Sequence, residues 1–599
     1  MIRLIEYKYL FLTLLFGGVC ISACQQDFFD QVPDDRITIE EVFKRRYESE
    51  QYLANIYANI RTEGNQASGS PWVGAADEAD MTYNWDGHAS HFMNIGMWDA
   101  NSNLAEFWSG YYRGIRSATY FIEHIGENEE ILRLPNGQQL IQQYAAEARF
   151  LRAWFYFCIL RQYGPMVIVR DIIPPDIPME EAQLERSPYD ECVAYIASEF
   201  DEAASVLPLR HANAAADLGR ATSAMCLAAK ARLLLYAASP LNNGNTDFAN
   251  FTNQDGTVLY NQSYDIEKWR LAAEAAKAVI DLNAFDLYRE YNADGSLNPM
   301  LSYQNAFIVP FNVEQIFMRP DWNYGEWDVM NTPRFAGGWS AMGATQQQVD
   351  AYFMANGKSI DEAGSGYVES GFSDEADAYT LAGTYNMFVN REPRFYASIV
   401  YSGSLWINRE EGDRVIEMHR YGNNGMEGQY NYSKTGYMVR KFVHPNANPR
   451  IGREVRRPYV MIRLGEVYLN YVEALNEYDP GNPDILRYLN LIRERAGIPG
   501  IEPGLGQEVM REKIRRERRV ELAFETLRYF DTRRWKISME TDRGPFYGLN
   551  VAAGNSLMDI EFYQRTAFES RVFHPNYYLF PIPQSEIDRA RLLVQNPGW

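Results

Sequence analysis

The chain has 599 residues, of which 46% are hydrophobic and 23% are charged, so its composition is that of a folded protein and excludes wholesale disorder. Its 79 Asp and Glu residues outnumber its 57 Lys and Arg residues, which gives a formal net charge of −22. A chain this acidic lacks the basic surface that nucleic-acid binding requires, and anionic membrane surfaces repel it.

The N-terminus has the pattern of a bacterial lipoprotein signal. A short basic segment precedes an uncharged, mostly apolar run over residues 9–21, which is too short to span a membrane. Two small residues then stand directly before Cys24, as in a lipobox. We therefore expect residues 1–23 to be a signal peptide and residues 24–40 a tether lipidated at Cys24, since more than one acyl chain anchors a protein stably. The alternative is an ordinary signal peptide that leaves Cys24 free.

Helix-period spacing of apolar residues dominates the rest of the chain. It is clearest over residues 141–162, which stop at Gly164 and Pro165. The same pattern predicts helices over residues 220–238, 268–282, 464–475, 483–496 and 507–530. Such helices pair as helix–turn–helix units, so we expect a mainly α fold with a tetratricopeptide-like scaffold of helical pairs, an α-solenoid. No repeat in the sequence marks the units of such a scaffold.

Two irregular regions interrupt the helices. Gly, Asn, Pro and aromatic residues dominate residues 285–450, which predicts a loop-rich variable subdomain, and residues 64–103 form a shorter irregular stretch. The predicted domains are an N-terminal helical scaffold over residues 41–284, the variable subdomain, and a C-terminal helical region over residues 451–599. Long loops on a compact body are often binding surfaces, so we expect the ligand to bind there.

Three cysteines lie in the body of the chain, Cys158, Cys192 and Cys226. Their odd number, their wide spacing and the lack of a CxxC pair argue against a disulfide framework. Each falls in an apolar helical pattern, which predicts buried free thiols, although one bridge among them stays open.

Seven segments appear in the same order as in a known family. They are EARFLRAWFYF at 147–157 with QYGP at 162–165, GRAT at 219–222 with AKARLLLYAASP at 229–240, NREPRF at 390–395, RLGEVYL at 463–469, IRERAG at 492–497, ERRVELAFE at 517–525, and LFPIP at 579–583 with QNPG at 595–598. Together they resemble the SusD/RagB family of outer-membrane nutrient-uptake lipoproteins of Bacteroidetes.

The resemblance implies a lipid-anchored protein of the outer membrane that faces the cell exterior. It would bind oligosaccharides without cutting them and hand them to a TonB-dependent SusC-like transporter, on which it sits as a lid. Part of the family is associated with peptide uptake, so a peptide ligand stays open. A purely structural lid and a glycoside hydrolase are the remaining alternatives.

The variable loops offer the residue types that bind sugars. Flat aromatic faces stack on sugar rings, while amides, carboxylates and guanidinium groups bind hydroxyls. The predicted ligand-binding residues are Trp98, Asn101, Trp322, Tyr324, Trp72, Tyr83, Trp85, Asp80, Asn323 and Trp327. Trp98 with Asn101, and Trp322 with Tyr324, are the preferred pairs. The alternative for each ring is packing inside its own loop.

The charged residues of the segment at 517–525 invite a catalytic interpretation. We expect Glu517, Arg518, Arg519, Glu521 and Glu525 to form a network between helices instead, because they lie in a long regular helix rather than in a loop.

No cofactor and no metal site is predicted. His88 and His91 form an HxxH pair without a third ligand nearby. Residues 242–247 and 253–256 are rich in oxygen-bearing side chains, but neither has the spacing of an EF-hand, so we expect turns, with Ca²⁺ as the alternative.

The sequence has no GxSxG elbow, phosphate-binding loop or dinucleotide fingerprint. A glycoside hydrolase would need two carboxylates in a cleft, for which Asp77, Glu78 and Asp80 are the candidates.

Overall fold

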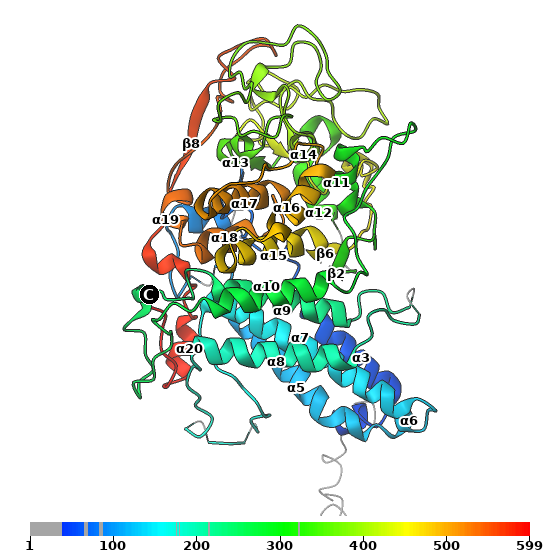
Figure 1. Cartoon of the computed structure of the whole chain (residues 1–599), viewed down its shortest axis with the longest axis vertical. Coiled ribbons are helices and arrows are strands. Elements are labelled where there is room, and N and C mark those ends of the chain that lie inside the picture. Colours follow the sequence, from blue (N-terminus) through cyan, green and yellow to red (C-terminus); the bar gives the residue numbers. More distant parts are fainter. Residues whose placement is uncertain are drawn as a thin grey trace, which may run out of the picture.

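The computed structural model describes residues 39–599 except 65–69, 83–87, 103, 175, 179, 214–215 and 321–323. Helices predominate in this part of the chain, and the described strands pair into two-stranded sheets. The fold is therefore mainly α, as predicted. Figure 1 shows the N-terminal helices in the lower half, the C-terminal helices in the middle, and the loops of the green to yellow segment at the upper end.

The N-terminal half is a series of helices that pack on one another. These are α2 (Ile39–Val42), α3 (Arg46–Ala58), α4 (Ala89–Asn94), α5 (Trp108–His124), α6 (Glu129–Leu132), α7 (Gly137–Tyr163), α8 (Tyr189–Val206), α9 (Ser223–Ala238) and α10 (Glu267–Ile280). Helix α7 packs on α5 and α8, α8 packs on α9, and α9 packs on α10. This is the tetratricopeptide-like arrangement of helical pairs.

Local sequence sets the ends of these helices. The Thr222 side chain accepts a hydrogen bond from the backbone N–H of Met225 and caps the N-terminus of α9. Helix α7 ends at Tyr163, and the next residue, Gly164, has a φ of 73°, which is accessible to glycine at little cost.

In its described residues, the variable subdomain consists of short elements between long loops. They are α11 (Pro299–Ile308), α12 (Gly325–Asn331), α13 (Gln346–Ala351), α14 (Pro393–Ser398), β2 (Gln315–Arg319), β3 (Met342–Ala344), β4 (Ile399–Val400) and β5 (Met438–Val439). Strand β3 pairs antiparallel with β1 (Ala79–Met81), with Asp80 opposite Gly343. This pairing joins the two irregular regions of the sequence.

The C-terminal region returns to helices. They are α15 (Leu464–Tyr478), α16 (Pro483–Arg495), α17 (Gln507–Glu521), α18 (Arg528–Arg534), α19 (Ser538–Thr541) and α20 (Gln584–Arg589). The strands are β6 (Tyr459–Arg463), which pairs with β2, and β7 (Gly544–Leu549), which pairs with β8 (Arg565–Arg571). Helix α15 packs on α10, so the two helical regions form one continuous body.

The single helix predicted over residues 507–530 is wrong. Helix α17 ends at Glu521, and α18 begins at Arg528 after a bend in which Phe524 and Thr526 have φ values of 63° and 67°. The bend brings the backbone N–H of Phe524 to 2.8 Å from Oε1 of Glu78, a tertiary contact that local sequence does not reveal.

The predicted charge network between helices is confirmed for four of its five members. Glu521 lies 2.7 Å from Arg463 and 2.9 Å from Arg394, all three being buried. The carboxylate of Glu517 binds Arg394 and Arg493, Arg518 binds Asp531, and Glu525 binds Arg463 and Lys441. Arg519 is not part of this network and instead lies 3.0 Å from the buried carboxylate of Asp77.

The three cysteines of the body are buried and free, as predicted. Burial raises the pKa of Cys158 and of Cys192 to about 12, so both are inert thiols at neutral pH.

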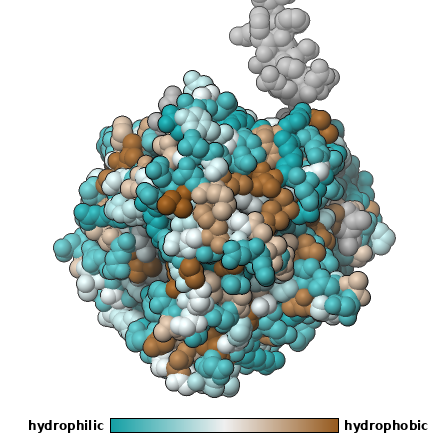
Figure 2. Space-filling view, turned by 90° about the horizontal axis from the view of Figure 1, so that it is seen from above, coloured by the Kyte–Doolittle hydropathy of each residue, from teal (hydrophilic) through white to brown (hydrophobic). Residues whose placement is uncertain are grey.

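Among the described residues, no helix combines the length and the apolar composition that a membrane span requires. Figure 2 shows the molecule from above, with hydrophobic residues in small groups among hydrophilic ones.

Candidate functional site

The predicted aromatic platform is wrong for the four rings that the structure describes. Trp72, Trp98, Tyr324 and Trp327 expose 1%, 7%, 1% and 3% of their surface. A ring that is sealed in the interior cannot offer its face to a sugar.

The two N-terminal indoles pack beneath residues from the far end of the chain. The ring of Trp72 lies 4.8 Å from that of Tyr529, and Trp98 lies 4.8 Å from Phe580 and 4.7 Å from Trp599. They therefore stabilise the contact between the two ends of the chain.

Tyr324 and Trp327 have comparable structural roles. The guanidinium of Arg457 stacks 4.1 Å from the ring centre of Tyr324. The indole N–H of Trp327 donates to the carbonyl of Lys441, and its ring packs against Phe442.

Asp80 also has a structural role. Its buried carboxylate lies 2.6 Å from Arg571 and 2.8 Å from Lys434. Burial alone would raise the pKa of Asp80, but these two cations outweigh it and lower the pKa.

Asn101 is exposed, in a turn where Asp99 accepts a hydrogen bond from its backbone N–H. Cys24, Tyr83, Trp85, Trp322 and Asn323 lie outside the described residues, so their predicted roles stay predictions.

The oxygen-rich segment 242–247 folds as a turn. The side-chain amides of Asn243 and Asn245 donate to backbone carbonyls, and the ammonium of Lys536 lies 2.7 Å from Oδ1 of Asn245 and 2.6 Å from Asp247. The ammonium of Lys536 thus occupies the position for which Ca²⁺ is the alternative in the sequence analysis.

Within the part of the chain that the structure describes, no group of three His, Cys, Asp or Glu side chains is arranged to hold a metal ion. His88 is buried at the start of α4, and burial together with Lys434 lowers the pKa of His91.

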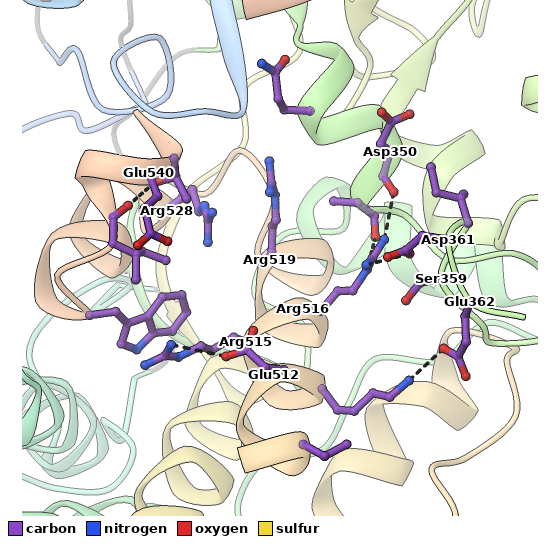
Figure 3. Close-up of a pocket in the computed structure, with 18 residues that line it drawn as sticks. Asp350, Ser359, Asp361, Glu362, Glu512, Arg515, Arg516, Arg519, Arg528 and Glu540 are labelled. Carbon is purple, nitrogen blue, oxygen red and sulfur yellow. Dashed lines mark hydrogen bonds and ion pairs between the residues drawn. The ribbon is translucent and has the colours of Figure 1, made fainter. Parts of the chain in front are cut away.

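The structure contains a cleft of about 820 Å³ that none of the predicted ligand-binding residues lines. Helix α17 forms one wall, α13 and the loop at 359–362 form the opposite wall, and α19 with Trp535 closes one side. Figure 3 shows the labelled side chains of these elements around the cleft. We call it the α17 cleft.

Charged side chains of both signs line the α17 cleft. The cations are Lys513, Arg515, Arg516, Arg519 and Arg528, and the carboxylates are Asp350, Asp361, Glu362, Glu512 and Glu540. Several pair across the opening: Arg516 lies 3.3 Å from Asp361, as Figure 3 shows, and Lys513 lies 2.9 Å from Glu362. These pairs link α17 to the loop at 359–362.

The floor of the cleft rests on a buried carboxylate. Asp77 binds Arg528 through two bonds of 2.7 and 2.9 Å and lies 3.0 Å from Arg519. Against the effect of burial, Arg519 and Arg528 lower the pKa of Asp77 to about 2, so this group stays ionised. Burial, reinforced by the charge of Arg528, lowers the pKa of Arg519 to about 10.

Glu78 lies behind this floor and is fully buried. Burial, together with the neighbouring charge of Asp77, raises the pKa of Glu78 to about 8. A protonated carboxyl beside an ionised one is a pattern found in glycosidases, but neither Asp77, Glu78 nor Asp80 lines the cleft. A sealed acid has no access to a glycosidic bond, so these three residues are structural.

Trp535 borders the α17 cleft but is only 4% exposed, so its ring supports Arg515 and offers no open face to a ligand. The guanidinium of Arg515 lies 4.9 Å from the ring centre of Trp535, and the indole N–H donates to Glu473 at 2.7 Å. Among the described residues, the ion pair of Arg515 with Glu512 is long, 3.5 Å, which leaves most of the guanidinium N–H groups for a ligand. Such a lining can donate to and accept from the hydroxyls of a polar ligand.

The sequence carried a signal for this cleft. Glu508, Arg511, Glu512, Arg515 and Arg519 recur at helical spacing and form one polar face of α17. The predicted charge network includes only the charges from Glu517 onward, and those of the first three turns of α17, several of which line the cleft, are not among the predicted site residues.

Two family models match the chain. The model described as the SusD family matches residues 312–599, and the model described as starch-binding associating with outer membrane matches residues 27–235. The two matches cover most of both helical regions.

Individual relatives agree over almost the whole length. A SusD-like protein, P2, of Formosa agariphila is 24% identical over 99% of this chain and 100% of its own. The structure of BT4246 has a TM-score of 0.79 and 26% identity, covering 92% of this chain and 99% of its own. A SusD-like carbohydrate-binding protein, BF0978, of Bacteroides fragilis shares the fold, with a TM-score of 0.70, 22% identity, and coverage of 92% and 99%.

Proposed function

The chain belongs to the SusD/RagB family, and we propose that it is a cell-surface lipoprotein that binds oligosaccharides without cleaving them. The observation that carries the proposal is the match to SusD-like proteins from end to end, in sequence and in fold. One matching model is described as starch-binding, and one structural relative is described as carbohydrate-binding.

Attachment to the outer membrane through a lipid on Cys24 is part of the proposal. The description of the matching model as associating with the outer membrane supports it, as does the lipobox pattern that ends at Cys24. We further propose that the protein faces the cell exterior and passes its ligand to a TonB-dependent SusC-like transporter.

The chemistry of the α17 cleft supports binding rather than hydrolysis. A glycoside hydrolase needs a general acid with a raised pKa beside the scissile bond. In the cleft, the pKa of Glu362 is instead lowered, by its hydrogen bond with Lys513. Asp361 and Glu512 are likewise engaged with arginines.

The test is an array of neutral and acidic glycans probed with the purified lipoprotein in detergent. Each glycan that binds is then incubated with the protein, and new reducing ends are measured. We expect saturable binding to at least one glycan and no new reducing ends. Sustained release of shorter sugars would identify a hydrolase, and an array without any bound glycan would reject glycan binding.

The transporter partnership has a separate test. The tagged lipoprotein is captured from solubilised outer membranes of its own organism, and the proteins that come with it are identified. We expect a TonB-dependent barrel protein in a fixed ratio to the lipoprotein. Capture of the lipoprotein alone would contradict this part of the proposal.

A further inference from the structure

We propose that the exposed face of α17 is an extended binding groove for a neutral, linear oligosaccharide, with Tyr264 and Arg515 among its contact residues. This inference rests on the proposed function and deepens it, because it names the binding surface and the class of sugar.

The first observation is that the α17 cleft continues into a second hollow. This hollow has a volume of about 540 Å³ and is lined by residues of α10, α15, α17 and the turn at 243–246. Both hollows are lined by Glu512 and Arg515, so they meet at these two side chains. From Glu508 to Arg519 the helix rises by about 17 Å, which gives the groove room for several sugar rings.

The second observation is an exposed ring in the second hollow. Tyr264 is 60% exposed and lines the hollow beside Trp269, which is buried. An exposed Tyr ring supplies a flat apolar face at low conformational cost, as sugar stacking requires.

The position of Tyr264 depends on a glycine. Gly244 has a φ of 75°, and a Cβ at this position would lie 3.0 Å from backbone atoms of Tyr264. The segment that carries the ring can therefore lie against the turn at 243–246 only because this residue has no side chain. Sequence and local backbone together build this end of the groove.

The third observation concerns charge and identifies the class of sugar. The whole chain carries 79 Asp and Glu against 57 Lys and Arg, yet the groove is lined by nearly equal numbers of cations and carboxylates. A balanced lining attracts neither anions nor cations over a distance. It does present both donors and acceptors, which suits a ligand whose hydroxyls serve as both. A neutral oligosaccharide has this chemistry, whereas a uronic acid or a sulfated sugar requires a surplus of cations.

Calorimetric titration of the full-length lipoprotein in detergent tests the proposal. The probes are the neutral sugars maltohexaose, laminarihexaose and xylohexaose, their trisaccharides, and the acidic sugar hexagalacturonate. We expect at least one neutral hexasaccharide to bind more tightly than its trisaccharide and to be insensitive to added salt. Tyr264→Ala and Arg515→Ala should each weaken its binding by about tenfold, and Tyr264→Phe should retain it.

Matched control variants separate the groove from general surface effects. Tyr291 is also 60% exposed but lines neither hollow, and the side chain of Arg487 is 67% exposed on α16. Tyr291→Ala and Arg487→Ala should bind like the wild type.

Two outcomes overturn the groove and leave the proposed function standing. The first is a neutral hexasaccharide that binds equally well to the wild type and to the Tyr264→Ala and Arg515→Ala variants. The second is a clear preference for hexagalacturonate that weakens with salt, which would make the ligand acidic. Binding of peptides but of no sugar in the panel or on the array would overturn both the groove as stated and the proposed function.

Discussion

At the scale of single residues, the buried carboxylate of Glu521 stabilises the charge network between the helices. Burial would raise the pKa of Glu521, but Arg495, Arg463 and Arg394 outweigh it and hold the pKa well below its usual range. Each of these buried guanidinium groups has a second carboxylate partner, Glu517 for Arg394 and Glu314 for Arg463 and Arg495, and Glu521 is the partner that all three share.

Glu521→Gln should lower the free energy of unfolding by about 3–5 kcal/mol, because it leaves these guanidinium groups without their shared counter-charge. Urea unfolding at neutral pH measures the change. Glu508→Gln on the same helix, where the side chain is 82% exposed, should change stability by about 0.5 kcal/mol or less. Equal effects of the two substitutions would show that the buried network contributes nothing beyond a surface charge.

Glu78 predicts a dependence of stability on pH. Its pKa is raised from 4.5 to about 8 in the folded protein, first by burial. Its contribution to stability is therefore complete below pH 4.5. It falls by about 1.4 kcal/mol per pH unit as the pH rises toward 8, since only the unfolded chain releases the proton.

Glu78→Gln removes this titration. Relative to the wild type, the variant should gain stability steadily from pH 5 to pH 8 in urea unfolding. The depressed pKa values of Asp77 and Glu473, both about 2, affect the wild type and the variant alike, and only at lower pH. A difference in stability that stays constant between pH 5 and pH 8 would show that Glu78 is ionised in the folded protein.

At the scale of elements, α5 and α7 approach closely at a glycine. A Cβ on Gly114 of α5 would lie 2.7 Å from the ring of Phe155, which is fully buried in α7. Gly110, one turn earlier in α5, has no atom within 4 Å of such a Cβ among the described residues.

The two glycines should therefore respond in opposite ways to alanine. Gly114→Ala should destabilise the protein by about 1–3 kcal/mol, because the tightly packed ring cannot move away. Gly110→Ala should stabilise it by up to about 1 kcal/mol, through higher helix propensity. Thermal unfolding of the two variants decides the question, and a stabilising Gly114→Ala would mean that the helices have room to separate.

The elements also show what the sequence could predict. Periodicity located α7, α9 and α10 to within a few residues, because a helix buried on one side repeats its apolar residues at a fixed spacing. It missed the bend between α17 and α18, because the positive φ values of Phe524 and Thr526 depend on contacts with Glu78 and with other distant residues.

At the scale of the whole molecule, aromatic residues in a loop-rich sequence did not indicate an exposed surface. Trp72 and Trp98 lie in irregular segments, yet residues near the C-terminus cover them. Exposure is a property of the assembled chain, so sequence alone could not distinguish these rings from Tyr264. The family and its helical scaffold were predictable, whereas the α17 cleft required the packing of α13, α17 and α19.

If Cys24 carries a lipid, the whole molecule is attached to the membrane through this residue. Cys24→Ser should move the protein from the membrane fraction into the soluble fraction, because the thiol that would carry the lipid is gone. Fractionation of cells followed by immunoblotting measures the shift, with Cys158→Ser as the control for a buried thiol in the body. Continued membrane association of Cys24→Ser would contradict lipidation at this residue.

The most direct measurement is a titration of the array-selected neutral hexasaccharide into the lipoprotein, followed by chromatography of the recovered sugar. We expect saturable binding, which Tyr264→Ala weakens, and full recovery of the hexasaccharide at its original length. Recovery of shorter sugars, or no heat of binding with any glycan tested, would contradict this expectation.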